Sequence, residues 1–519
     1  MMETFIDRAP VSNEEVPLDP QGRLARVKQR VKDEYRFNQS DFHIDESSFE
    51  RVTDPNANEK LLYESLCNSK LVDGTLENID MTLYGADGYQ SVFLRSCYFD
   101  FFELILDSLV MTHSNEYRLI LGSPGIGKSW FHVFCLYVLI KANAPVCLQR
   151  NEHFVLFYEG EVYLAKGKLK DWVFGDSNIW FLYDRNEAPI GISHENIKIF
   201  VSSILNRRAY KECSYHSSLK LFMPLWNYKE LMHANRVRSV ERRLTEKHLL
   251  EAYLLCGGVA QNIFDNFVDY RMNYHLLLDN IPMSDLKHGK LKELNCQIIG
   301  LRVWERYFTF DQEFLSKSIG RDVFQRLSDK AGITMQQTLN SNECAYYLKS
   351  IAFACEGLKE FGVPKKEFLL QSLDDKKFDM VISFPDGLST AEFLGLTLDN
   401  VVWDPSIPAK LWIPQFSTFP CIDGLLLLPS QKLALGLKFT TCSKEPIVRE
   451  LLGELTEHCE SKFEGSRFAM VFVVRKRDYD SFGRQGQSSF GKRRYSGIDE
   501  LFCEPSEEVP CPQYKLKMF

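Results

Sequence analysis

The chain lacks the sequence features of secreted, membrane-spanning and disulfide-bonded proteins. No apolar run approaches the roughly 18–20 residues that cross a bilayer as a helix. Residues 1–8 carry neither the basic stretch nor the apolar stretch of a signal peptide. The 14 cysteines are scattered and contain no C-x-x-C pair, which is typical of reduced thiols and disfavours both a disulfide framework and a zinc site. Together these absences predict an intracellular protein with no membrane partner.

An excess of positive charge is also missing. The chain holds 62 lysines and arginines against 70 aspartates and glutamates, so its formal net charge is −8. A protein of this charge has no overall field that attracts nucleic acid, and any such contact needs a local basic patch. The 519 residues, of which 45% are hydrophobic and 25% charged, suffice for roughly two to four globular domains with buried cores.

One motif sets the chain apart. An apolar strand is expected at residues 117–121 and an apolar helix at 130–140, and the loop between them fits G-x-x-x-x-G-K-[ST]. The loop residues are Gly122, Ser123, Pro124, Gly125, Ile126, Gly127, Lys128 and Ser129. A glycine-rich turn with an incidental lysine is the alternative, and the strand–loop–helix context favours a phosphate-binding loop.

The residue types of this loop match the needs of a nucleoside triphosphate and Mg²⁺. Glycines allow successive backbone N–H groups to turn toward a phosphate, and the start of the following helix adds a partial positive charge. Lys128 is expected to reach the β- and γ-phosphates, and the Ser129 hydroxyl is expected to bind Mg²⁺.

A second part of such a site is a carboxylate for Mg²⁺ at the end of a neighbouring buried strand. Residues 179–183 are apolar and Asp184 follows them, which predicts this carboxylate. Glu187 either polarises a water for hydrolysis or is a surface acid. The serine pair at 202–203 ends a third apolar strand and is either a γ-phosphate sensor or a turn signal. The arginine pair at 207–208 is either a transition-state cation or exposed surface charge.

Composition and periodicity divide the chain into five regions. These are a polar and helical region at 1–75, an α/β nucleotide-binding domain at 76–270, a helical segment at 271–341, a second α/β domain at 342–475 and a flexible basic tail at 476–519. The second α/β domain is expected to contain a helix at 344–361 and strands at 378–384, 422–428, 433–440 and 468–474. Short basic clusters at 475–477 and 492–494 indicate either nuclear import or nucleic-acid contact, or else a solvated tail.

The segment at 200–231, which includes F-V-S-S-I-L-N and F-M-P-L-W-N-Y-K-E-L, gives the chain a family resemblance. Taken in order with the loop, Asp184 and the G-G-V at 257–259, it resembles the Crinkler effectors of oomycetes and fungi and the retrotransposon-hot-spot proteins of trypanosomes. The resemblance implies a P-loop NTPase of STAND/AAA-like type. In that family Pro-Arg normally follows the Gly-Gly-hydrophobic motif, whereas this chain has Ala260-Gln261. If that arginine touches the γ-phosphate, its replacement implies less efficient hydrolysis.

The resemblance extends to a restriction-endonuclease-like domain, carried by residues 411–415, 419–424 and 435–441. A nuclease of this kind needs carboxylates at one end of a β-hairpin to bind Mg²⁺, and a lysine nearby to orient water. Asp423 and Lys438 match these roles, and Glu356 is the candidate for an additional acid and metal ligand.

One position departs from the nuclease pattern. The residue two before the lysine is normally Glu, Asp or Gln, and here it is Gly436, which cannot bind a metal. An alternative register places Lys438 at the acid position and Thr440 at the lysine position, which suits a divalent cation no better. Three interpretations stay open: an active nuclease, a nuclease fold that has lost catalysis, and no such fold.

These observations lead us to expect an α/β protein with one of two modes of action. In the first, Lys128, Ser129 and Asp184 bind and hydrolyse Mg–NTP, either ATP or GTP, and this activity is coupled to a DNA-directed, nuclease-like domain. In the second, nucleotide binding switches the protein, and the nuclease-like domain engages DNA or a protein without cutting. A purely structural protein follows only if the loop is incidental.

The resemblance also implies where the protein acts. A Crinkler-like protein is expected in a nucleus, either its own cell's or a host's, with host nuclear proteins as partners and oligomerisation allowed. No translocation header of that family is recognised at the N-terminus, so an endogenous role stays open beside secretion into a host.

Overall fold

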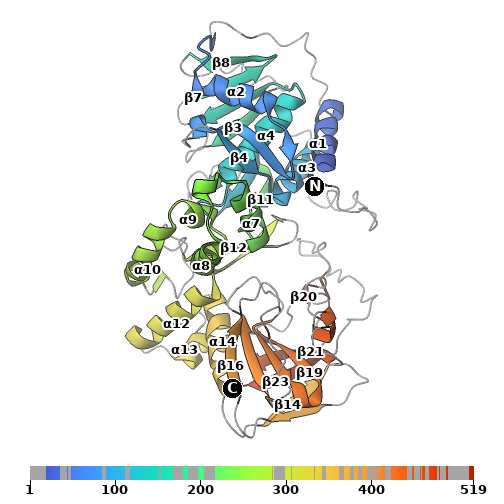
Figure 1. The fold of residues 1–519 in the computed structure, drawn as a ribbon, viewed down its shortest axis with the longest axis vertical. Coiled ribbons are helices and arrows are strands. Elements are labelled where there is room, and N and C mark those ends of the chain that lie inside the picture. Colours follow the sequence, from blue (N-terminus) through green and yellow to red (C-terminus); the bar gives the residue numbers. More distant parts are fainter. Residues whose placement is uncertain are drawn as a thin grey trace. The chain divides into compact units, whose positions relative to one another are not determined.

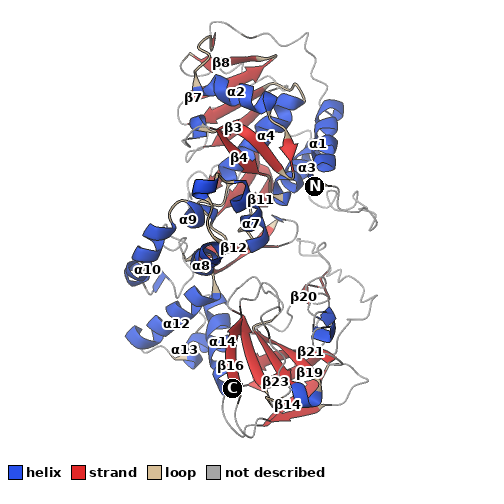
Figure 2. Cartoon of the chain, viewed as in Figure 1, coloured by secondary structure: helices blue, strands red, loops and turns tan. Residues whose placement is uncertain are grey.

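Two eight-stranded mixed sheets dominate the computed structural model, one in each of two units (Figure 1). The first unit comprises residues 1–250, 258–265 and 307–310, and the second comprises residues 251–257, 266–306 and 311–519. Apart from short isolated pieces, the structure describes residues 19–34, 48–84, 89–111, 117–150, 153–166, 179–184, 197–203, 217–282, 298–304, 307–331, 334–341, 346–361, 367–373, 379–383, 388–393, 409–414, 422–440, 467–475 and 513–518. Both units contain helices and strands, as Figure 2 shows, which makes the protein mixed α/β.

The sheet of the first unit has a parallel centre and an antiparallel edge. Its strand order is β1-β8-β7-β6-β9-β10-β5-β11. The run from β6 to β11 in this order is parallel, and β7, β8 and β1 continue the sheet beyond β6, each antiparallel to its neighbour. These strands are β1 (Phe49–Arg51), β5 (Tyr117–Gly122), β6 (Val146–Arg150), β7 (His153–Tyr158), β8 (Glu161–Ala165), β9 (Trp180–Asp184), β10 (Ile197–Ser203) and β11 (Ser217–Phe222).

Continuous apolar sequence explains the parallel centre, because strands covered on both faces need apolar side chains at every position. Residues 119–121 of β5 and residues 180–183 of β9 are fully buried. The helices of this unit are α1 (Pro20–Glu34), α2 (Asn58–Asn68), α3 (Ser96–Met111), α4 (Lys128–Lys141), α7 (Tyr228–Val237), the start of α8 (Glu246–Cys256) and α9 (Ala260–Phe264). A small antiparallel sheet of β2 (Leu71–Val72), β3 (Thr75–Asp80) and β4 (Tyr89–Phe93) completes it.

Helix α1 belongs to this unit, although the region at 1–75 showed no functional signal in the sequence. Its apolar side chains Leu24, Val27 and Val31 are buried. Three arginines of α1 form ion pairs with three acids of α3 at one constant sequence offset, and the pairs are Arg23–Asp100, Arg26–Glu103 and Arg30–Asp107. This alignment shows that α1 and α3 run side by side along matched faces.

The sheet of the second unit has the order β15-β14-β23-β21-β19-β18-β17-β16. Strands β17, β18 and β19 form an antiparallel meander, and β21 lies parallel to β19. Its strands are β14 (Glu367–Ser372), β15 (Met380–Ser383), β16 (Ser389–Phe393), β17 (Lys410–Pro414), β18 (Gly424–Leu428), β19 (Leu433–Thr440), β21 (Arg467–Arg475) and β23 (Gln513–Met518). Its described helices include α10 (Phe267–Asn280), α12 (Lys317–Ala331), α13 (Met335–Asn340) and α14 (Tyr346–Phe361).

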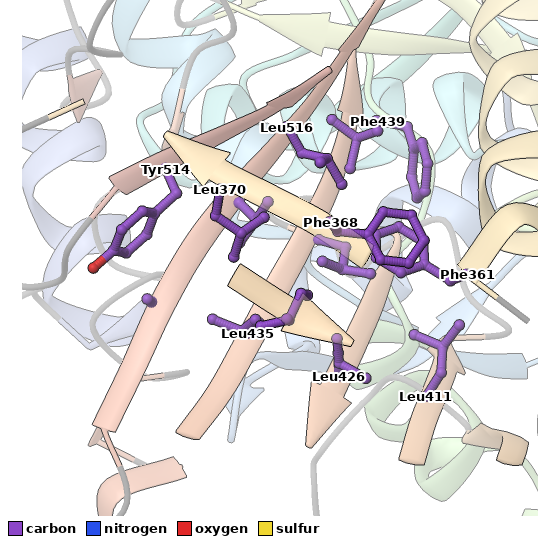
Figure 3. Packing of buried hydrophobic residues seen from close by; sticks show 14 of the residues in the cluster. Phe361, Phe368, Leu370, Leu411, Leu426, Leu435, Phe439, Tyr514 and Leu516 are labelled. Carbon is purple, nitrogen blue, oxygen red and sulfur yellow. The ribbon is translucent and has the colours of Figure 1, made fainter. Parts of the chain in front are cut away.

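A cluster of aromatic and aliphatic side chains joins α14 to this sheet (Figure 3). Phe361 of α14 stacks on Phe368 of β14 with ring centroids 4.6 Å apart. Phe439 of β19 meets Phe361 and Phe353 edge-on at 6.3 and 5.8 Å. The alternate β19 residues Leu435 and Phe439 belong to the cluster, as the two-residue period of a strand requires.

Two parts of the chain differ from the sequence-based expectations. The stretch at 271–341, expected to be helical, also contains β12 (Ile299–Trp304) and β13 (Thr309–Phe314), which pair with each other. The tail at 476–519, expected to be flexible, supplies β23, which pairs with both β14 and β21. Tyr514 and Leu516 of β23 alternate into the apolar cluster, and this short alternation is a strand signal that the charged surroundings obscured.

None of the helices in the described residues is both long enough and apolar enough to cross a membrane.

Gly357 offers a test of the packing of α14 on the sheet. A Cβ added at this helical position would fall well inside van der Waals contact with the Phe439 ring. Gly-to-Ala replacements in helices usually stabilise by about 1 kcal/mol, but overpacking a buried ring costs roughly 1–3 kcal/mol. We therefore expect Gly357→Ala to speed hydrogen exchange of the β19 amides. Ser350→Ala on the same helix is the control that adds no volume, and slower exchange in Gly357→Ala than in the wild type would contradict this packing.

Candidate functional site

The predicted phosphate loop joins the end of β5 to the start of α4. Gly122 is the last residue of β5, and Gly127 is the N-cap of α4, whose first residue is Lys128. Residues 131–139 of α4 are buried. The loop is therefore anchored on both sides by buried elements, and the start of α4 is fixed within it.

Backbone conformation makes glycine necessary at two loop positions. Gly125 and Gly127 have φ of 71° and 96°, in the left-handed region that favours glycine. A Cβ at Gly127 would lie 2.7 Å from the Tyr98 hydroxyl oxygen, and one at Gly125 would lie 2.8 Å from Cβ of Gln261. The two glycines of the motif thus serve both the turn and the close approach of neighbouring residues.

Lys128 turns its side chain back along the loop. Its Nζ donates to the carbonyl oxygen of Ser123 at 2.6 Å and to that of Gly122 at 3.3 Å. The ammonium therefore lies beside the first half of the loop, where it places a positive charge next to the loop amides. Ser129 follows on the first turn of α4 and is half-buried.

The strand order places this loop at a point where open α/β sheets bind ligands. The chain leaves β5 toward β6 and leaves β10 toward β11, so the connections after these two neighbouring strands run in opposite directions along the sheet. Ligands of open parallel sheets bind outside the carboxyl ends of strands at such a point. The loop at 122–129 lies at the carboxyl end of β5.

Asp184 is the last residue of β9, as the sequence predicted for the Mg²⁺ carboxylate. Strand β10 separates β9 from β5, with Val201 opposite Asp184 and Ser203 opposite Gly122. The backbones of Asp184 and Gly122 thus end at the same edge of the sheet, two strand spacings or about 10 Å apart across it. The side chains of Asp184 and of the serine pair at 202–203, together with Glu187 and the arginine pair at 207–208, lie outside the described residues.

The Gly-Gly segment that carried part of the family resemblance lies against the loop. The backbone N–H of Gln261 donates to the carbonyl oxygen of Gly125 at 3.0 Å. The N–H of Trp226 donates to the carbonyl oxygen of Gly258 at 3.0 Å. A Cβ at Gly258 would meet the Trp226 backbone, so glycine is required for this approach. Gln261, which stands where the family has arginine, is exposed above Gly125.

In the second unit the predicted acid and lysine lie side by side. Lys438 Nζ is 3.6 Å from Asp423 Oδ2, and both side chains are 14% exposed. The same Oδ2 accepts the backbone N–H of Phe439 at 2.9 Å. The structure therefore brings Asp423 and Lys438 together at the start of β18 and on β19. Glu356 is on α14, and its side chain lies outside the described residues.

Packing explains why no acid stands at Gly436. A Cβ there would lie 2.8 Å from side-chain atoms of Ile422, Met470 and Phe468. Ile422 and Met470 are 0% and 1% exposed, so the space is filled by apolar groups. An acid at this position would be buried among them without a hydrogen-bonding partner, which is strongly unfavourable.

The described part of the chain contains no cluster of potential metal ligands. Within it, no group of three or more His, Cys, Asp or Glu side chains is arranged to hold a metal ion. A Mg²⁺ site at the loop would rest on Ser129 and a nucleotide's own phosphates together with Asp184, whose side chain is not among those described.

Sequence reasoning missed several residues that contact the loop. Tyr98 and Arg95 precede the loop by about one helix, and Trp226 and Glu230 lie more than 90 positions beyond it. Tyr98 and Trp226 donate hydrogen bonds to loop carbonyls, and Arg95 pairs with Glu230. The capping-box pattern N-x-x-E at 227–230 was a local signal for a helix start, and the structure shows that box in place.

A scan against models of protein families and searches of curated proteins and of solved structures find no match to this chain. The role of the site therefore has to be inferred from its residues.

Gly436 provides a test of the packed nuclease-like site. We expect Gly436→Glu to loosen the pairing of β19 with β21 rather than to create a metal ligand, because the new side chain enters an apolar space. Hydrogen exchange of the β19 and β21 amides should accelerate, and Mg²⁺-dependent plasmid cleavage should not rise. Thr390→Glu, at an exposed position of β16, is the control. Gained cleavage with unchanged exchange would show that the site accepts an acid.

Proposed function

We propose that the first unit binds a nucleoside triphosphate with Mg²⁺ at the loop 122–129 and hydrolyses it. The observation that carries the proposal is the glycine loop with Lys128, placed between a buried parallel strand and the N-terminus of α4. An anion at this position is favoured by the helix N-terminus, by the loop amides and by the ammonium of Lys128. The strand order adds support, because the loop is at the point where such sheets bind ligands.

Each residue of the proposed site has a distinct task. The backbone amides after Gly125 hold phosphate oxygens, and Lys128 exchanges its bonds to loop carbonyls for the β- and γ-phosphates. Ser129 and Asp184 fit the oxygen ligands that Mg²⁺ prefers, and Mg²⁺ supplies charge neutralisation on the transferred phosphoryl group. Glu187 remains the candidate for orienting the attacking water.

For the second unit we propose a nuclease-like fold directed at DNA. The antiparallel meander β17-β18-β19 with parallel β21, and the Asp423–Lys438 pair on its hairpin, agree with the resemblance to the Crinkler and retrotransposon-hot-spot proteins. Action in a nucleus follows from that resemblance, and DNA, host nuclear proteins and further copies of the chain are its candidate partners.

A second candidate function is a nucleotide-dependent switch whose nuclease-like domain binds without cutting. Two observations favour it over an active nuclease. Apolar side chains fill the space at Gly436 where an acid would ligate metal, and Asp423 already accepts the N–H of Phe439 and forms an ion pair with Lys438. Gln261 lies beside the loop at the position where the resemblance implies an arginine. Because glutamine is neutral, the positive charge expected near the γ-phosphate is absent at this position.

Lys128→Ala tests the nucleotide site directly. Removing one charged hydrogen-bonding group should weaken Mg–ATP binding by roughly ten- to hundredfold and reduce phosphate release at least as much. Calorimetry and a phosphate-release assay measure the two quantities, with Lys229→Ala on the exposed face of α7 as the control.

Plasmid DNA in the same assay separates the two candidate functions. Nicking that disappears in Asp423→Asn supports an active nuclease. Nucleotide binding and DNA binding without nicking support the switch. If the wild-type protein binds neither ATP nor GTP, the proposed nucleotide site is wrong.

A further inference from the structure

Three successive carbonyls of the loop are each held by a donor from outside the loop. The Gly125 oxygen accepts the N–H of Gln261 at 3.0 Å. The Ile126 oxygen accepts the indole Nε1–H of Trp226 at 2.8 Å. The Gly127 oxygen accepts the hydroxyl of Tyr98 at 2.9 Å, in addition to the N–H of Phe131 in the first turn of α4 at 3.2 Å.

Because the peptide bond is planar, these contacts to the carbonyls also determine the direction in which the loop N–H groups point. In a planar trans peptide the carbonyl of one residue and the N–H of the next point in opposite directions. Donors that hold the carbonyls of residues 125–127 on the outside therefore aim the N–H groups of residues 126–128 to the inside. These are the N–H groups that an anion-binding concavity needs.

Trp226 is itself fixed by a buried ion pair. The Arg95 guanidinium lies 4.7 Å from the Trp226 ring centroid and is 1% exposed. It donates to the carbonyls of Pro224 and Leu225, each at 3.0 Å, and forms two bonds of 3.1 Å with the carboxylate of Glu230. The backbone before the indole and the carboxylate of Glu230 after it are thus tied to one rigid cation, so the indole N–H has little freedom to leave the loop.

Tyr98 is a donor over the whole range of physiological pH. Burial raises the pKa of its phenol well above the usual value, an effect that Arg95 only partly offsets. Because the raised pKa keeps the hydroxyl protonated, its bond to the Gly127 carbonyl persists until pH rises through that pKa. The ring packs on Phe131 and Phe134 of α4, at 5.7 and 6.2 Å between centroids, which holds the hydroxyl at the loop.

We propose that Tyr98 and Trp226 are positioning residues for anion binding, which act by holding the loop carbonyls so that the amides of residues 126–128 face the phosphates. This inference rests on the proposed nucleotide site and goes beyond it, because neither side chain belongs to the loop motif. One residue precedes the loop in sequence and the other follows it, and the two converge on neighbouring peptide groups. They would therefore set the affinity for the polyphosphate without touching it.

Two conservative variants test the proposal. Trp226→Phe removes the indole N–H and keeps an aromatic ring beside Arg95, and Tyr98→Phe removes only the hydroxyl. Each should weaken Mg–ADP binding, measured by calorimetry, by about three- to tenfold, the effect of one lost hydrogen bond that orients a binding group. Hydrogen exchange at residues 126–128 in the Mg–ADP complex should accelerate, while the melting temperature without nucleotide should stay near that of the wild type.

Tyr228→Phe is the matched control, because its partly buried hydroxyl also donates to a backbone carbonyl, that of Glu246 at 3.4 Å, which is not part of the loop. Wild-type affinity in both Trp226→Phe and Tyr98→Phe overturns the inference and leaves the nucleotide site standing. An equal loss in Tyr228→Phe also overturns it, since the effect is then general. Should Trp226→Phe fail to fold, Tyr98→Phe alone decides. No binding of Mg–ADP or Mg–ATP by the wild type overturns the nucleotide site and this inference together.

Discussion

The hydrogen bonds of the loop carbonyls are the constraint on which the first unit depends. A peptide group has one donor and one acceptor, and a loop that offers its donors to an anion must satisfy its acceptors elsewhere. Here the two halves of the loop solve this differently. The carbonyls of Gly122 and Ser123 accept the Lys128 ammonium, whereas those of residues 125–127 are held from the outside. Both solutions leave positive or partially positive groups on the side where a phosphate would bind.

This constraint explains features of the sequence that look unrelated. Gly258 lacks a side chain because the Trp226 backbone passes too close for a Cβ, and that approach carries the Gln261 N–H to the loop. Arg95 is a fully buried cation, which is costly unless it is paired and hydrogen-bonded, and Glu230 and two carbonyls meet that requirement. The same Glu230 closes the capping box of α7, so one carboxylate serves both the start of this helix and the guanidinium of Arg95.

Local pattern was enough to predict the loop, β5, α4, β9 and the strands β15, β18, β19 and β21 of the second sheet, because burial on one or both faces fixes their apolar sequence. It was not enough for features that depend on distant partners. The Arg95–Glu230 pair joins residues 135 positions apart, and no local period marks it. Strand β23 is six residues long and follows a charged stretch, so the alternation of its apolar side chains was too short to predict a strand. Its pairing with β14 and β21 is seen only in the structure. Strand β12, which pairs with β13, was likewise not predicted because it lies inside a segment expected to be helical.

The two departures from the family pattern differ physically, and they constrain function differently. At Gln261 the contact with the loop is made by the backbone N–H, so the change from arginine removes a charge and leaves the architecture of the loop untouched. At Gly436 the missing side chain has been replaced by Ile422, Phe468 and Met470, so the acid cannot return without repacking β19 against β21. The first departure changes only the charge of one exposed side chain beside the loop. The second lies in a packed core, so an acidic side chain at this position requires a rearrangement of its apolar neighbours.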